Sequence, residues 1–189
     1  MITKNPEKEQ MKQPKVLFED KWFEVVDVNG QVGIKNKHMT VAVLPYDTDE
    51  HGMVKSIGLL HELNYFREGD YCDTLITGTV EYEDDSLLLA AQRELKEEGG
   101  YTVEENDRWL FLGPIYPYKD SDKVVPVFAV NVTDKTQGEA EGDGSDKEKK
   151  SKLVMTDVRE GIACDEGLVL AAFLRLFNFM YAKSMNYVQ

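Results

Sequence analysis

Residues 78–101 read GTVEYEDDSLLLAAQRELKEEGGY, and the interpretation of the whole chain starts from this stretch. It contains three carboxylates at positions i, i+3 and i+4, namely Glu94, Glu97 and Glu98. On an α-helix, which turns by about 100° per residue, these three side chains share an arc about 100° wide. Like charges at this spacing destabilise a helix, so their clustering suggests a counter-ion. A hard divalent cation such as Mg²⁺ takes oxygen ligands of this kind.

The alternative is an ordinary solvated helix face, because the chain contains 35 acidic residues. The residues around the cluster favour the metal site. Apolar residues recur at helical spacing and form one face to bury: Leu88, Ala91 and Leu95, with Leu87 beside them. Ser86 or Asp85 is a suitable N-cap, and Gly99-Gly100 is a suitable C-terminal stop. The stretch therefore predicts a helix whose buried face adjoins an acidic one.

This arrangement resembles the Nudix hydrolase signature, which reads Gly, five residues, Glu, seven residues, and then Arg-Glu-aliphatic-x-Glu-Glu-x-Gly-aliphatic. The helical half matches in register at Arg93, Glu94, Leu95, Glu97, Glu98 and Gly100, and Tyr101 replaces the last aliphatic residue. In the loop half, counting back from Arg93 reaches Asp85, where the family has Glu. The glycine is Gly78, one position earlier than the motif asks, so one extra residue is expected between Gly78 and Asp85.

The resemblance implies hydrolysis of a pyrophosphate bond with Mg²⁺ or Mn²⁺ as cofactor. Glu94, Glu97, Glu98 and the carbonyl of Gly78 are the metal ligands that it implies, and the three glutamates with Arg93 are the expected catalytic residues. A divalent ion neutralises phosphate charge and lowers the pKa of a bound water. Arg93 is expected to hold a carboxylate in place, since a guanidinium suits bidentate pairing, and a surface ion pair is the alternative.

Outside the signature, the layout resembles the ADP-ribose pyrophosphatase branch of the family. The similar segments are MTVAVLPYD at 39–47, LGPIYPYKDSDKVVPVFAV at 112–130 and GIACDEGLVLAAFLRLF at 161–177. The leading expectation is therefore cleavage of ADP-ribose, a nucleoside diphosphate linked to another group, to AMP and ribose 5-phosphate. Other Nudix substrates are the alternative: a nucleoside triphosphate, a dinucleoside polyphosphate, NADH or a nucleotide sugar. The two departures in the loop also leave open a nucleotide-binding module without turnover.

Base stacking, the general base and the oligomeric state each have their own candidates. A nucleoside base needs an aromatic platform, and Tyr65, Phe66 and Tyr116 are candidates, with packing in the core or a loop as the alternative. The general base stays open among several carboxylates: Glu94 itself, Glu139, Glu141, Glu148, Glu160 and Glu166. In relatives the N-terminal strand region helps to build a homodimer, which the resemblance implies here too.

Hydrophobic periodicity predicts an α/β (α+β) fold, which the resemblance sharpens to an α/β/α sandwich with a mixed sheet plus an N-terminal antiparallel strand region. Asn29-Gly30 is a hairpin signal within that region. Outside it, the expected strands are residues 39–45, 55–63, 72–76, 109–115, 124–132 and 153–158. Residues 165–183 are expected to form a core helix capped by Asp165.

The expected organisation is a disordered tail at 1–14 followed by one domain at 15–189, of which 15–37 is the strand region. Residues 133–152 have one apolar residue, Ala140, and are expected to be a flexible charged loop, either an inert insertion or a lid.

Composition excludes several classes of function. The net charge of −13 argues against general nucleic-acid binding, although a bound metal would let an acidic enzyme take an anionic substrate. There is no run of about 18 apolar residues and no apolar N-terminal segment, which predicts a cytoplasmic protein without a membrane span. The two cysteines, Cys72 and Cys164, make no disulfide framework.

Overall fold

The computed structural model describes residues 13–67, 69–142 and 151–185. From Thr40 onward, the apolar run expected at 39–45 lies in the larger of its two sheets. The chain divides into two units. The smaller unit combines the chain up to Met39 with Tyr118–Lys123. The larger unit combines Thr40–Pro117 with the chain from Val124 onward.

The smaller unit contains a three-stranded antiparallel sheet of β1 (Lys15–Glu19), β2 (Phe23–Val28) and β3 (Gln31–Asn36), in that order. The expected hairpin turn is present, with positive φ at Asn29 (56°) and Gly30 (85°). Residues 118–123 lie along β3, since the Ile34 N–H donates to the Asp120 carbonyl and the Asp122 N–H donates to that of Ile34, at 2.9 and 3.1 Å. Of the expected tail, residues 1–12 lie outside the described part of the chain.

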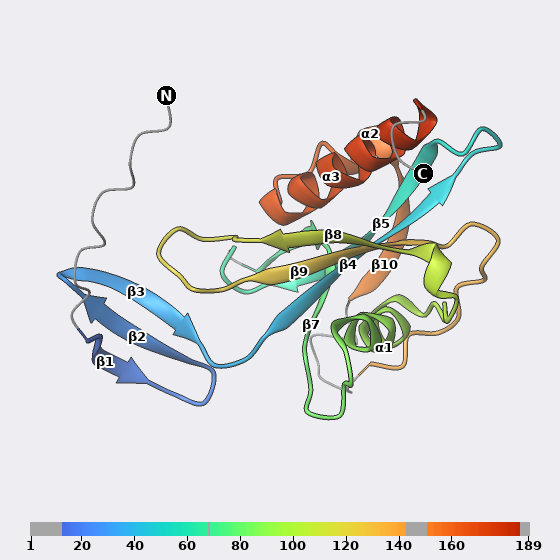
Figure 1. Cartoon of the computed structure of the whole chain (residues 1–189). Helices are drawn as coiled ribbons and strands as arrows, with labels where there is room; N and C mark the ends of the chain where they lie inside the picture. Colours follow the sequence, from blue (N-terminus) through green and yellow to red (C-terminus); the bar gives the residue numbers. More distant parts are fainter. Residues whose placement is uncertain (1–12, 68, 143–150, 186–189) are drawn as a thin grey trace, which may run out of the picture. The chain divides into compact units, whose positions relative to one another are not determined.

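The larger unit contains a seven-stranded mixed sheet (Figure 1). Its strands are β4 (Thr40–Thr48), β5 (Val54–Asn64), β6 (Asp70–Thr74), β7 (Ile76–Thr79), β8 (Trp109–Ile115), β9 (Val125–Asn131) and β10 (Lys152–Asp157). The order is β10-β5-β4-β9-β8, with β6 paired to β5 and β7 paired to β4. The β4–β9 pair is parallel and the others are antiparallel. The helices are α1 (Leu87–Gly99), the 3₁₀ turn η1 (Asn106–Arg108), α2 (Val158–Gly161) and α3 (Gly167–Ser184).

Helices α1 and α3 cover opposite faces of this sheet (Figure 1). Alternate residues of β4 point to the two faces, so Leu44 packs in one core cluster with Leu176 of α3. Val43 packs in the other cluster with Ala91 and Leu95, which lie on the buried face of α1. Burial on both sides explains why β4 reads as a continuous apolar run. The expected α/β/α sandwich with a mixed sheet is confirmed.

Two local predictions are wrong. The single strand expected at 72–76 is two strands, because the chain leaves β5 after Thr74 and joins β4 at Ile76, with Leu75 fully buried at the crossing. The cap of α3 is Glu166 rather than Asp165, since the Glu166 carboxylate accepts the Leu168 N–H at 3.1 Å.

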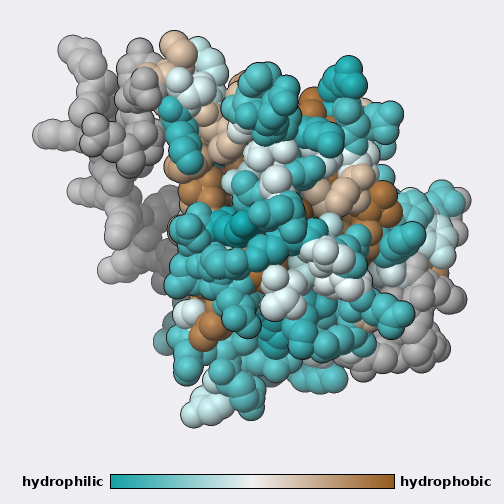
Figure 2. All heavy atoms as spheres, turned by 90° about the vertical axis from the view of Figure 1, so that its right-hand side faces the viewer, coloured by the Kyte–Doolittle hydropathy of each residue, from teal (hydrophilic) through white to brown (hydrophobic). Residues whose placement is uncertain are grey.

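The surface agrees with the acidic composition. The face drawn in Figure 2 is mostly hydrophilic, and its hydrophobic residues form small separate patches. Within the described ranges, no helix has the length and apolar character needed to span a membrane.

Candidate active site

Helix α1 has the two ends that its sequence predicts. The Ser86 hydroxyl accepts the Leu89 N–H at 3.2 Å, which caps the first turn. Gly100 ends the helix in the left-handed conformation, with φ at 69°. Ala91 and Leu95 are fully buried against the sheet. The core contact of these two residues sets the rotation of the helix and thereby directs its carboxylates.

The Glu94 carboxylate lies directly against the backbone of Gly78 in β7. A Cβ atom added to Gly78 would stand 1.8 Å from Glu94 Oε1, so a side chain there would displace the carboxylate. The Glu94 side chain is only 9% exposed. Burial raises the pKa of Glu94, while the neighbouring Arg93 guanidinium acts in the opposite direction. The position of Gly78 in the signature thus has a steric reason here.

Arg93 makes five hydrogen bonds, three to the segment before α1 and two within the helix. On the loop side, Nε and Nη2 donate to the two oxygens of Asp84, at 3.3 and 3.0 Å, and Nη2 donates to the Thr79 carbonyl at 2.8 Å. On the helix side, Nη1 donates to Glu94 Oε1 at 2.7 Å and to Glu97 Oε2 at 2.9 Å. The bond to Asp84, with the two glutamates, raises the pKa of Arg93. The expected bidentate pairing of this arginine is therefore present.

The partner in that pairing is Asp84, one residue before Asp85, which counting back from Arg93 aligns with the Glu of the signature. Asp85 is exposed, whereas the Asp84 side chain is 8% exposed; burial alone would raise the pKa of Asp84, but its bonds to Arg93 and to the Glu81 N–H lower it. Residues 79–83 separate Gly78 from Asp84, which is the five-residue spacing of the signature. If Asp84 is the acidic residue of the signature, the extra residue lies after it rather than before it. Asp85 is then the inserted residue, because Ser86 already caps α1.

The donor set of this region fits a hard divalent ion. The carboxylates of Glu94, Glu97 and Glu98 project from adjacent turns of α1, and Glu98 Oε2 is buried. Within the described chain, no three His, Cys, Asp or Glu side chains converge on one point as a formed metal site. In this structure Arg93 Nη1 bonds Glu94 and Glu97 at once. The three carboxylates and the nearby Gly78 carbonyl are oxygen ligands of the kind that Mg²⁺ prefers. To bind there, the ion would have to replace Arg93 at one of the carboxylates.

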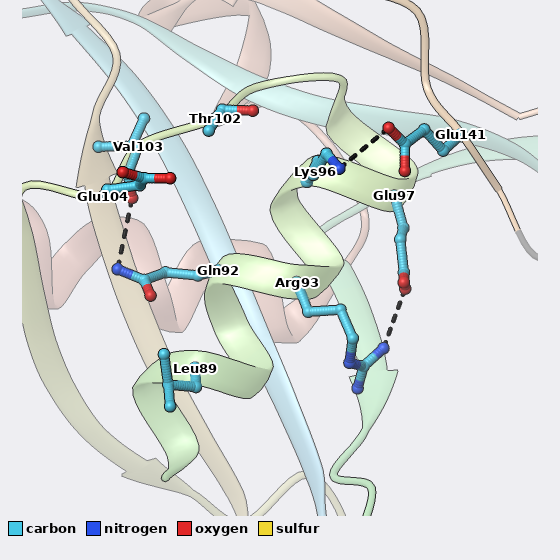
Figure 3. Close-up of a pocket in the computed structure, with 9 residues that line it drawn as sticks. All are labelled: Leu89, Gln92, Arg93, Lys96, Glu97, Thr102, Val103, Glu104 and Glu141. Atoms are coloured by element: carbon cyan, nitrogen blue, oxygen red, sulfur yellow. Dashed lines mark hydrogen bonds and ion pairs between the residues drawn. The ribbon is translucent and has the colours of Figure 1, made fainter. Parts of the chain in front are cut away.

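A pocket on the same helix lies away from the Glu94 carboxylate (Figure 3). Gln92 and Lys96, which line it, are each two residues from Glu94 and so lie about 160° around the helix from it. Arg93 and Glu97 form the edge of the pocket nearest the carboxylates, and Figure 3 shows them turned toward each other. This pocket therefore belongs to the outer face of α1.

The aromatic candidates for base stacking lie on two turns of the larger unit. Tyr65 and Phe66 follow β5 and are 63% and 100% exposed. Tyr116 follows β8 and is 68% exposed. None of the three packs in the core, so their rings are accessible, and their role in binding stays a prediction.

The candidates for the general base have different surroundings. Glu166 caps α3, and Glu141 pairs with Lys96 at 3.0 Å. Glu139 and Glu160 are exposed. Glu148 lies in residues 143–150, outside the described part of the chain. Only Glu94 among the candidates lies within the carboxylate cluster of α1.

Comparison with known proteins identifies the same part of the chain. The family model described as NUDIX domain matches residues 36–157, which is 122 of 189 residues. A solved structure described as "Crystal structure of ADP compounds hydrolase" superposes with a TM-score of 0.65, at 18% identity, over 94% of this chain and 96% of that one. At this identity the likeness shows a shared fold. No curated protein matches the chain.

The position of the extra residue is tested by the pair Asp84→Asn and Asp85→Asn. Asp84→Asn should lower the free energy of unfolding by about 2 kcal/mol, because it weakens two charged hydrogen bonds of a largely buried arginine. Asp85→Asn should change it by less than about 0.5 kcal/mol, as an exposed substitution does. Urea denaturation at pH 7 measures both. A larger loss for Asp85→Asn than for Asp84→Asn would contradict the assignment.

The burial of Glu94 predicts how stability depends on pH. Because its pKa is raised in the folded state, its contribution to stability is present below the unfolded value of 4.5 and is lost as pH rises through the folded value. Glu94→Gln removes this loss. In EDTA, the melting temperature of Glu94→Gln relative to the wild type should therefore be higher at pH 7 than at pH 4. The pKa of Asp84 is shifted in the opposite direction, but Asp84 is present in both proteins, so its effect on the relative melting temperature cancels. A relative melting temperature that falls toward pH 7 would contradict the prediction.

Proposed function

This chain belongs to the Nudix family and is a pyrophosphohydrolase, and we propose that it acts on a nucleotide compound, a nucleoside diphosphate linked to another group, with ADP-ribose first. The products would be AMP and ribose 5-phosphate. The observation that carries the proposal is the Glu94 carboxylate seated on Gly78 and bonded to Arg93. This contact brings together the glycine of the loop half and the first glutamate of the helical half of the signature.

Glu94, Glu97, Glu98 and the Gly78 carbonyl would hold Mg²⁺ or Mn²⁺. When bound, the ion supplies charge neutralisation at the pyrophosphate and lowers the pKa of a coordinated water. Glu97 is the carboxylate best placed to exchange Arg93 for the ion, since its side chain is 37% exposed against 9% for Glu94. Arg93 keeps its bonds to Asp84 and Thr79 in this exchange and continues to orient Glu94.

Two observations support a nucleotide substrate, and the first of them favours ADP-ribose. The segments before and after the signature resemble the ADP-ribose pyrophosphatase branch, and the similar solved structure is described as an ADP compounds hydrolase. Tyr65, Phe66 and Tyr116 are accessible rings on which a base would stack. A nucleoside triphosphate, a dinucleoside polyphosphate, NADH or a nucleotide sugar is the alternative substrate. The cytoplasmic location stays a prediction of the sequence.

The activity test is incubation with ADP-ribose and either Mg²⁺ or Mn²⁺, with AMP and ribose 5-phosphate as the expected products. Glu97→Gln and Glu98→Gln should each lower the rate by about a hundredfold or more, which corresponds to about 3 kcal/mol of lost stabilisation by the metal. EDTA should abolish turnover. Glu104→Gln is the control, because Glu104 is exposed and lies beyond the end of α1.

Three results would count against the proposal. Cleavage of another pyrophosphate compound with ADP-ribose left intact would refute the substrate. Near-normal turnover in both glutamine variants would refute the metal ligands. Tight nucleotide binding in calorimetry with no hydrolysis under either ion would show a binding module instead of an enzyme.

We also propose a homodimer, on the basis of the smaller unit. Its three-stranded sheet exposes large apolar side chains: Val16, Leu17, Phe18, Trp22, Val32 and Ile34. A sheet of this size has little core of its own, and apolar side chains gathered at a surface mark an interaction site.

Sedimentation velocity should give twice the chain mass of 21.5 kDa. Phe18→Glu should shift the protein to the monomer, because it places a charge among these apolar side chains, while Glu19→Gln on the same strand should not. A monomeric wild type at micromolar concentration would refute the dimer.

A further inference from the structure

The carbonyl end of α1 is bound by a segment about forty positions later in the chain. The last carbonyls of a helix have no partner inside it and need donors from elsewhere. Here three of them accept hydrogen bonds from residues 137–142, which we call the strap. The bonds run from the Gly142 N–H to Glu97 O (3.0 Å), from Gln137 Nε2 to Gly99 O (3.0 Å) and from the Gly138 N–H to Gly100 O (2.8 Å).

The contact between strap and helix is a close backbone approach. Gly100 has φ at +69°, and a Cβ atom there would lie 2.4 Å from the carbonyl oxygen of Gly138. Gly100 is therefore needed twice, once for the left-handed turn that ends α1 and once for the space that the strap occupies. A side chain at this position would separate the two segments.

Gln137 extends the connection to the sheet. Its Nε2 also donates to the Leu153 carbonyl of β10 at 3.3 Å, and the Leu153 side chain packs in the same core cluster as Leu95 of α1. One amide group thus links the end of the helix to the strand below it. The strap makes a further contact through the Lys96–Glu141 ion pair at 3.0 Å, which is half exposed and contributes little.

The carbonyls bound by the strap belong to the turn that carries two proposed metal ligands. Glu97 accepts a strap bond through its own carbonyl, and Glu98 is the next residue. Helix ends open locally when their carbonyls lack partners, and Mg²⁺ requires ligands held close to octahedral geometry. We propose that the strap positions Glu97 and Glu98 for divalent-cation binding, with Gln137 as its main positioning residue. The inference rests on the proposed function, because it concerns the metal ligands of that site.

The contacts of the strap also bear on the role expected for residues 133–152. A stretch with almost no apolar residue was expected to be an inert insertion or a lid. In the described part, up to Gly142, it acts through two backbone N–H groups and one side-chain amide instead. These contacts need no apolar surface, which is consistent with the sequence of the strap, QGEAEG.

The test compares Gln137→Leu with Gln92→Leu. Each replaces a glutamine whose Nε2 donates to a backbone carbonyl, but Gln92 bonds the Val103 carbonyl at 3.4 Å from the middle of α1. Without substrate, Gln137→Leu should bind Mn²⁺ about tenfold more weakly, as measured by electron paramagnetic resonance of the free ion. Amide hydrogen exchange at residues 97–101 should be faster. Gln92→Leu should match the wild type in both measurements.

Kinetics separate positioning from general damage. In Gln137→Leu the Mn²⁺ concentration for half-maximal rate should rise about tenfold, while kcat at saturating Mn²⁺ stays close to that of the wild type. Gly100→Ala, which displaces the strap from the other side, should repeat this pattern. Melting curves confirm that each variant is folded at the assay temperature.

The outcomes distinguish this inference from the function on which it rests. If the wild type neither binds Mn²⁺ nor hydrolyses any pyrophosphate compound, the proposed function fails, and the positioning role fails with it. If the wild type does both and Gln137→Leu has unchanged Mn²⁺ affinity and unchanged exchange at 97–101, the positioning role alone is overturned. A fall in kcat at saturating Mn²⁺ with unchanged Mn²⁺ affinity would also overturn it.

Discussion

The interaction on which the site depends is the binding of one guanidinium by two segments. Arg93 bonds Thr79 and Asp84 in the loop and bonds Glu94 and Glu97 on the helix. In a chain with net charge −13, this cation allows several carboxylates to lie close together. It also opposes the rise that burial imposes on the pKa of Glu94. The positive charge of Arg93 thus offsets the carboxylates and at the same time holds the preceding segment to α1.

Helix α1 is placed by two contacts that exclude a side chain, one at its middle and one at its C-terminal end. At Gly78 the backbone of β7 receives the Glu94 carboxylate, and at Gly100 the end of the helix receives the carbonyl of Gly138. Ala91 and Leu95 hold the helix to the sheet. The positions of the carboxylates therefore follow from core packing and two close backbone approaches, rather than from the local helix alone. Both approaches join segments that are distant in sequence.

The sequence predicts well what local patterns determine. The caps of α1, the Asn29-Gly30 hairpin and the buried strand β4 all follow from neighbouring residues. Counting alone does not locate the inserted residue, because a motif with one insertion can be aligned from the glycine or from the arginine. The pairing of Arg93 with Asp84 favours the alignment from the glycine, and this contact cannot be read from the sequence. The strap could not be predicted, since its contacts with α1 are made mainly by backbone groups and have no side-chain signature. The passage from β6 to β7 has no turn signal in the sequence, because the single residue Leu75 separates the two strands.

Arg93 divides its hydrogen bonds between two sets of partners, and this division affects how the site would accept a metal ion. Two of its five hydrogen bonds go to the carboxylates that are proposed to bind the ion, and three go to Asp84 and Thr79. An ion that takes Glu97 from Arg93 therefore leaves the loop attached to the helix. A bound ion would neutralise the like charges on α1 in place of the guanidinium. The same arrangement thus stabilises the helix through Arg93 and leaves the Glu97 carboxylate accessible for the ligand role proposed for it.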